Sequence, residues 1–180
     1  MQVYAIKVTL LGTIPPIWRR ILVGRDMTLR NLHRTLQTVM GWEDSHLHQF
    51  VLPKQKVRKS RQGSGTRIGN ESRTRVGDVI GGAGERFIYE YDFGDSWQHE
   101  LLLEEVLLGD ESFQQMCVAG ERRCPPEDCG GLHGFAELLE ALQDANHPTH
   151  EEVCDWLGDF DPAWFSADEI NRQLRRRRKR

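Results

Sequence analysis

The 180-residue sequence lacks the features of several common protein classes. No apolar run approaches the roughly 20 residues that span a bilayer, so no contact with a membrane is expected. The first residues lack the basic and hydrophobic segments of a secretory signal. No internal repeat is present. These absences predict a cytoplasmic protein built around one ordinary hydrophobic core.

Common catalytic motifs are absent as well. There is no G-x-S-x-G turn for a nucleophilic serine, and no phosphate-binding glycine pattern follows a predicted strand. The triplet Asp92-Phe93-Gly94 matches a kinase motif, but no H-R-D catalytic loop accompanies it. Cysteine is scarce: there are four, without the C-x2-C pairs of a zinc ribbon. In a cytoplasmic chain they suggest thiols or metal ligands before disulfides.

The formal net charge of −3 hides a strong asymmetry. Residues 54–75 carry eight basic residues against one acid, and residues 175–180 are all basic, which leaves −16 for the rest of the chain. We predict one domain over residues 1–174, with a mobile basic loop at 53–75 and a basic tail at 175–180. Such basic segments attract nucleic acid electrostatically. The alternative is a solvated loop and a frayed tail.

A hairpin and a helix are predicted in the first forty residues. Alternating apolar residues indicate strands over residues 2–11 and 17–23, which we expect to pair. Apolar residues at helical spacing then predict a helix, capped by Asp26 or Thr28 and running to Met40. Hairpin followed by helix is the order in which a β-grasp core begins.

A third strand over residues 47–52 and a second hairpin over 87–93 and 97–103 follow from the same alternation. The last third is predicted to be helical outside the cysteine-bearing segment, with capping boxes starting at Thr149 and Ser166. The predicted class is therefore α+β. Its sheet would be β-grasp-like and mixed, with two hairpins, one central helix and one extra strand, and the C-terminal helices would pack on it.

The segment from Cys117 to His133 gathers three of the four cysteines among prolines and glycines. This composition predicts a turn-rich loop in place of a helix or strand, ordered by a metal, a disulfide or tight packing beneath a helix. We expect the loop to fold back onto the sheet. Zinc prefers a tetrahedral set of cysteine and histidine ligands. The spacing C-x6-C-x4-C-x3-H would supply Cys117, Cys124, Cys129 and His133, with Cys154 as a substitute. Ordinary buried thiols are the alternative.

A second polar group lies at the tip of the second hairpin, between Asp92 and His99. Its acids and histidine suit a metal or a polar ligand, unless Asp92 and Asp95 only bind backbone amides while Trp97 fills the core. His46 and His48 share one face of the third strand, and would join this site if the strands are neighbours. The candidate catalytic residues are His46, Asp92, Asp95 and His99.

Several segments together resemble the plasmid pRiA4b open reading frame three family, over about residues 2 to 174. They are I-P-P-I-W-R-R, T-L-R-N-L-H, G-W-E-D-S-H-L-H-Q-F, Y-D-F-G-D-S-W-Q-H, C-P-P-E-D-C-G-G and W-L-G-D-F-D-P-A-W-F. The resemblance implies a setting linked to plasmids and insertion elements, without establishing a reaction. The family's characteristic polar positions would here be His46, Asp92, Asp95, His99, Cys124, Glu127, Asp128 and Cys129.

Three functions remain open at this point. The first is a non-catalytic binding module for a protein partner, whose candidate ligand-binding residues are Trp42, Trp97, Glu127 and Asp128. The second is a metal-dependent hydrolase or nuclease, which uses the candidate catalytic residues to activate water. The third is a nucleic-acid accessory protein, which acts through the basic residues 54–75 and 175–180.

Overall fold

The structure, a computed structural model, describes residues 1–52 and 66–177. Most of the predicted basic loop and the end of the tail therefore lie outside the described residues. The strands are β1 (Gln2–Leu10), β2 (Ile17–Gly24), β3 (His48–Leu52), β4 (Thr66–Arg67), β5 (Arg86–Tyr91), β6 (Trp97–Leu108) and β7 (Met116–Glu121). The helices are α1 (Leu29–Met40), α2 (Val76–Val79), α3 (Gly131–Gln143), α4 (His150–Leu157) and α5 (Ala167–Arg177).

The strands form one open sheet in the order β4-β3-β5-β6-β1-β2-β7. Both predicted hairpins are present, β1 with β2 and β5 with β6. The α+β class is confirmed. The β-grasp-like description is not, because every pairing among the described strands is antiparallel, whereas a mixed sheet was expected.

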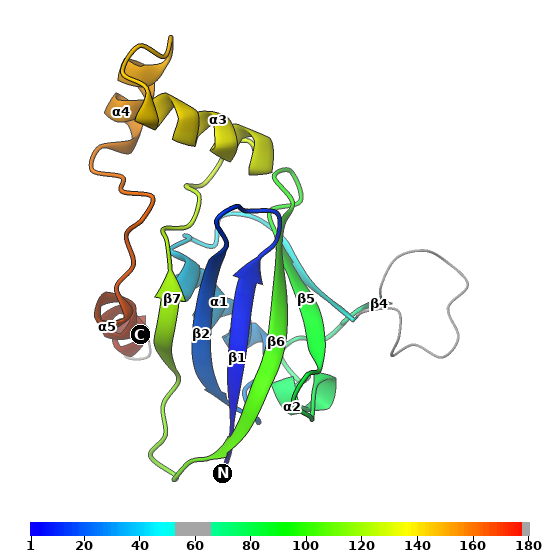
Figure 1. The fold of residues 1–180 in the computed structure, drawn as a ribbon. Helices are drawn as coiled ribbons and strands as arrows, with labels where there is room; N and C mark the ends of the chain where they lie inside the picture. The colour runs from blue at the N-terminus through cyan, green and yellow to red at the C-terminus, as the bar shows by residue number, and fades with distance from the viewer. Residues whose placement is uncertain (53–65, 178–180) are drawn as a thin grey trace.

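One face of the sheet packs against α1, which lies behind the sheet in Figure 1. Phe87, Tyr89 and Tyr91 of β5 point into this core, and their alternation with exposed or half-buried neighbours is typical of a sheet with one buried face. The opposite face carries charged pairs, such as Arg86 with Glu100 at 3.1 Å.

Both ends of α1 follow the sequence prediction. Thr28 accepts a hydrogen bond from the Asn31 amide at 3.3 Å, which caps the first turn. Gly41 closes the helix with a φ of 89°, a left-handed conformation that glycine adopts without strain. The Ser166 hydroxyl likewise accepts from the Glu169 amide before α5. The capping box predicted at Thr149 is wrong, because its side chain makes no capping hydrogen bond.

The cysteine-bearing segment is only partly a loop. Its first residues form β7, which pairs with β2 along the edge of the sheet, so Cys117 is buried in a strand. Residues 122–130 form the loop, and α3 begins at Gly131. Figure 1 shows α3 and α4 beyond one end of the sheet and α5 beside β7.

Arg19 fastens this loop to the sheet although its side chain is buried. Its guanidinium donates to the backbone carbonyls of Val39, Glu121 and Arg122 at 2.8–2.9 Å and to the Cys124 sulfur at 3.3 Å. The loop therefore lies against α1 and the strands, as expected of a loop that folds back onto the sheet. Within the described ranges, no helix is long and apolar enough to cross a membrane.

Candidate metal centre

The end of β5 brings His46 and Asp92 together. Tyr91 is the last residue of β5 and pairs with His48 of β3. Asp92 then turns away with a φ of 56°, and its amide donates to the Leu47 carbonyl at 2.9 Å. This bond holds the residues before β3 against the tip of the hairpin, so the imidazole of His46 lies beside the Asp92 carboxylate.

The cysteine loop closes over the same place. The Gly130 amide donates to Asp95 Oδ2 at 3.2 Å, and the indole of Trp42 donates to the Pro125 carbonyl at 3.0 Å. Glu127 Oε1 accepts from the Glu43 amide at 2.9 Å and from the Tyr91 hydroxyl at 3.0 Å. Three segments that are distant in the sequence are thus held together by hydrogen bonds.

Four side chains meet where these segments converge. His46 Nε2 lies 3.2 Å from Asp128 Oδ1, 3.7 Å from Glu127 Oε2 and 3.8 Å from Asp92 Oδ2. One ligand atom each from His46, Asp92 and Asp128 lies within 4.8 Å of the other two, a spacing that suits a single cation. We call these three residues, with Glu127, the His46 centre.

Two buried atoms of the His46 centre have no hydrogen-bond partner: His46 Nε2 and Glu127 Oε2. A buried polar atom without a partner is costly, and a cation between the two would satisfy both. The Asp92 side chain is 10% exposed, whereas that of Asp128 is 73% exposed, so the centre is closed on one side and open to water on the other. One imidazole nitrogen with carboxylate oxygens suits divalent ions such as Mn²⁺ or Zn²⁺.

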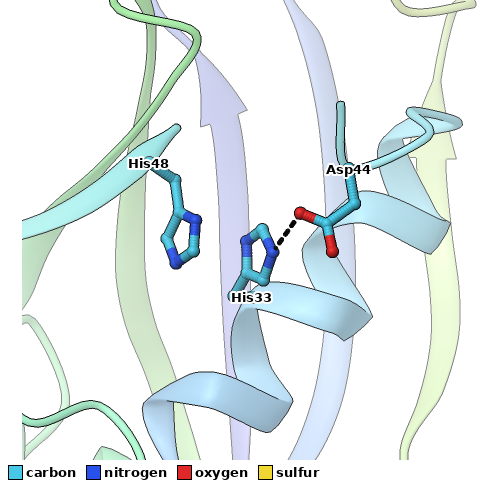
Figure 2. A group of neighbouring side chains, drawn as sticks. All are labelled: His33, Asp44 and His48. Atoms are coloured by element: carbon cyan, nitrogen blue, oxygen red, sulfur yellow. Dashed lines mark hydrogen bonds and ion pairs between the residues drawn. The ribbon is translucent and has the colours of Figure 1, made fainter. Parts of the chain in front are cut away.

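A second cluster lies nearby on α1 and β3. Figure 2 shows His33, Asp44 and His48 facing one another. His33 Nε2 is 2.7 Å from Asp44 Oδ1 and its Nδ1 is 2.8 Å from the Tyr89 hydroxyl, while His48 Nε2 is 2.9 Å from Glu71 Oε2. Each histidine therefore has a carboxylate partner of its own.

The two imidazoles of this cluster are stacked face to face. Their centroids are 3.5 Å apart and their planes lie 5° from parallel. A metal ion binds a histidine close to the plane of its ring, about 2 Å from the nitrogen. One ion cannot lie in two parallel planes, so His33 and His48 do not form a shared metal site in this arrangement. Burial and the neighbouring His48 lower the pKa of His33, which Asp44 opposes.

Two predicted catalytic residues lie outside the His46 centre. His99 is completely buried on the inner face of β6, with its ring edge-on to Trp42 at 5.1 Å. Burial lowers its pKa to about 4. Asp95 binds the Gly130 amide instead of facing His46. The third strand does neighbour the second hairpin and His46 joins Asp92, but His48 does not share this site, because it belongs to the other cluster.

The predicted ligand-binding residues divide in the same way. Trp42 and Trp97 are buried and stack at 6.3 Å between ring centroids, so they build the core and offer no surface to a ligand. Glu127 and Asp128 belong to the His46 centre. Its members were all named from the sequence, but in different groups.

The predicted zinc ligands do not gather. Cys124 is buried between Arg19 and Met40, and the His133 side chain is 83% exposed beside Glu137. Burial raises the pKa of Cys117 to about 11, which favours the thiol over the thiolate that zinc requires. Among the described residues, the clusters with metal-ligand spacing are the two above, and neither contains a cysteine.

A groove of about 560 Å³ runs from Glu127 along the cysteine loop to α4 and α5. Two half-exposed tryptophans line it, Trp156 at 54% and Trp164 at 41%. The Arg123 guanidinium lies 4.7 Å from the ring centre of Phe160 and 5.8 Å from that of Trp164. The sequence did not predict this groove, because Trp156 was noted only as part of a segment that resembles the family. It did not predict the second cluster either, because His33 and Asp44 share no linear motif.

Comparisons with known proteins match this chain over most of its length. The sequence pattern described as "Plasmid pRiA4b ORF-3-like protein" matches residues 2–169. The chain belongs to the pRiA4b ORF-3-like family. Uncharacterized protein y4hQ of Sinorhizobium fredii is 33% identical over 176 residues, which cover 96% of this chain and 91% of that protein.

A crystal structure of a similar protein has the same fold. The crystal structure of MM3350 from Methanosarcina mazei Go1, a protein of unknown function, has a TM-score of 0.82 and 36% identity to this chain. The match covers 93% of this chain and 97% of that one. The residues of the His46 centre come from three of the segments that carried the family resemblance. Neither relative has an assigned activity, so the chemistry must be inferred from this centre.

Proposed function

We propose that this pRiA4b ORF-3-like protein is a metal-dependent hydrolase, whose divalent ion is held by His46, Asp92 and Asp128. One observation carries the proposal: a histidine nitrogen and carboxylate oxygens from three separate segments converge within 4.8 Å of one another. The hydrogen bonds of Tyr91, Asp95 and Trp42 hold these segments in place before any ion arrives. Such preorganisation is what a metal site requires of its supporting residues.

The open side of the centre supports hydrolysis. The exposed Asp128 carboxylate leaves that side accessible to water, so an ion held there keeps positions for a water molecule and a substrate. A bound divalent ion lowers the pKa of its water and produces a nucleophile near neutral pH. Glu127 Oε2, buried and 3.7 Å from His46 Nε2, is placed to serve as a further ligand or to accept the proton of that water.

Calorimetric titration tests the metal site. The chelator-treated chain should bind about one Mn²⁺ or Zn²⁺ ion, and His46→Gln or Asp92→Asn should weaken binding about a hundredfold. Matched controls are His133→Gln, whose side chain is exposed, and Asp155→Asn on the surface of α4. Both should bind as the wild type does. Equal binding by all variants would show that the ion binds outside the His46 centre.

Hydrolysis is tested with chromogenic phosphomonoesters, phosphodiesters and carboxylic esters. We expect turnover of one class that requires the ion, disappears in Asp92→Asn and persists in Asp155→Asn. Stoichiometric ion binding without turnover in any class would contradict the catalytic half of the proposal and favour a structural ion.

The second candidate is a binding module, favoured by the exposed tryptophans along the groove. Arg123 and Arg177 also line it, so a fitting partner is a peptide that combines an acidic and an aromatic side chain. Peptides selected from a display library against the full chain should bind Trp156→Ala or Trp164→Ala more than about tenfold more weakly. Phe93→Ala, which removes an exposed aromatic ring outside the groove, is the control. Equal loss in the control would contradict the groove as the binding surface.

A further inference from the structure

The stacked histidines lie in a pocket that is rich in positive charge. The pocket, about 460 Å³, lies between α1, the residues before β3 and the turn that follows β4. This volume falls within the range of small-molecule sites. Three arginines line it with the two histidines: Arg30 and Arg34 from α1, and Arg67 from β4.

The carboxylates of this pocket are already engaged. Asp44 contacts His33 at 2.7 Å and Glu71 contacts His48 at 2.9 Å. Across residues 1–52 and 66–177, no carboxylate lies within ion-pair distance of Arg30, Arg34 or Arg67. Counted without the histidines, the three arginines and the two carboxylates give the lining a net charge of +1, which favours an anion over a cation.

We propose that this arginine pocket binds the phosphoryl group of a small phosphorylated molecule. Guanidinium groups match the oxygens of a phosphate with paired, charge-assisted hydrogen bonds. A metal ion is not the occupant, because the parallel rings of His33 and His48 cannot ligate one ion. The proposal does not depend on an ion at the His46 centre.

The size of the pocket, about 460 Å³, favours the phosphoryl group of a small molecule over the backbone of a nucleic acid. A phosphomonoester exposes three oxygens that can reach arginines from different sides of a pocket, whereas a phosphodiester exposes two and continues in both directions. The volume also leaves room for the organic part of a small ligand beyond its phosphoryl group.

Calorimetric titration of the full chain with inorganic phosphate tests the inference. Chelator is present throughout, so that the result is separate from metal binding, and chloride keeps the ionic strength constant. We expect saturable binding that weakens about tenfold or more in Arg30→Gln/Arg34→Gln and in Arg67→Gln. Arg34→Lys keeps the positive charge but lacks the paired N–H donors of a guanidinium group, and should bind phosphate with intermediate strength.

Arg86→Gln is the matched control, since Arg86 pairs with Glu100 on the opposite face of the sheet. It should bind phosphate as the wild type does. Equal weakening by Arg86→Gln, or unchanged binding by the pocket variants, would overturn the proposal and leave the arginines as solvated charges. Circular dichroism confirms that each variant is folded.

The source of the phosphoryl group is tested with two further ligands. A phosphomonoester such as glycerol phosphate should bind at least as tightly as inorganic phosphate and show the same loss in the pocket variants. A short single-stranded DNA should compete only weakly. Preferential binding of the DNA, lost in the same variants, would contradict a small-molecule ligand and assign the pocket to a nucleic-acid backbone.

Discussion

His99 is of a residue type that often serves in catalysis, but it is buried in the core and is not part of the His46 centre. His99 lies on the inner face of β6, where its Nδ1 is 3.3 Å from the Tyr89 carbonyl and its Nε2 has no partner. The surrounding rings of Trp42 and Tyr89 exclude water from it. An imidazolium is therefore strongly disfavoured there, and the residue acts as a neutral aromatic member of the core.

The pKa of His99 makes the stability of the fold depend on pH. Burial lowers this pKa to about 4 from an ordinary 6.5, so the unfolded chain binds the proton more tightly than the folded chain. The stabilisation is complete above pH 6.5 and is lost as pH falls towards 4, by about 3 kcal/mol over that range. His33, whose pKa is also lowered, changes stability in the same direction.

Urea unfolding at pH 7, 5.5 and 4 measures this effect. His99→Phe, which keeps an aromatic ring, should lose less free energy of unfolding between pH 7 and 4 than the wild type. His133→Gln removes an exposed histidine and should follow the wild-type dependence. Parallel pH profiles for His99→Phe and the wild type would contradict a neutral, buried His99.

At the scale of elements, the sequence predicted those whose signals are local. The ends of α1 were predicted because Thr28 and Gly41 act within one turn of the helix. The alternation of apolar and polar residues identified both hairpins, because every second residue of β5 and of the first part of β6 is buried.

Elements that depend on distant partners were missed. The strand β7 contains Cys117 and Gly120, and its sequence alone has no strand pattern; it is extended because β2 offers it backbone partners. Asn171 of α5 adds to this, as its side chain accepts from the Cys117 amide and donates to the Cys117 carbonyl, both at 2.8 Å. The capping box predicted at Thr149 was wrong although its signal is local, because the motif does not guarantee that the side chain forms its hydrogen bond.

At the scale of the whole molecule, the His46 centre depends on three segments meeting. Alternation predicts which face a residue occupies, but not which strands become neighbours or where a loop returns. For that reason the sequence grouped Asp92 with His99, which shares its hairpin, and left Asp128 with the cysteines. In the structure the loop after β7 folds back over the hairpin tip and brings Asp128 to His46.

We expect the affinity of the His46 centre for a metal ion to depend on Asp95, which holds the loop after β7 in place. Asp95 Oδ2 accepts from the Gly130 amide at 3.2 Å, next to the loop residue Asp128, yet Asp95 is not a ligand. Asp95→Ala removes that anchor, so the loop must be ordered when the ion binds. We expect Mn²⁺ affinity to fall about tenfold, as is usual for residues that orient ligands. Asp95→Asn keeps an oxygen acceptor and should retain most of the affinity.

Asp110→Ala is the matched control for Asp95→Ala, because Asp110 anchors a different loop by accepting from the Ser112 amide at 2.8 Å. Titration calorimetry gives the affinities, and hydrogen exchange of the residue 127–130 amides reports the order of the loop. These amides should exchange faster in metal-free Asp95→Ala and regain protection at saturating Mn²⁺. Unchanged affinity together with faster exchange would mean that the loop's position does not limit ion binding, and that His46 and Asp92 hold the ion without it.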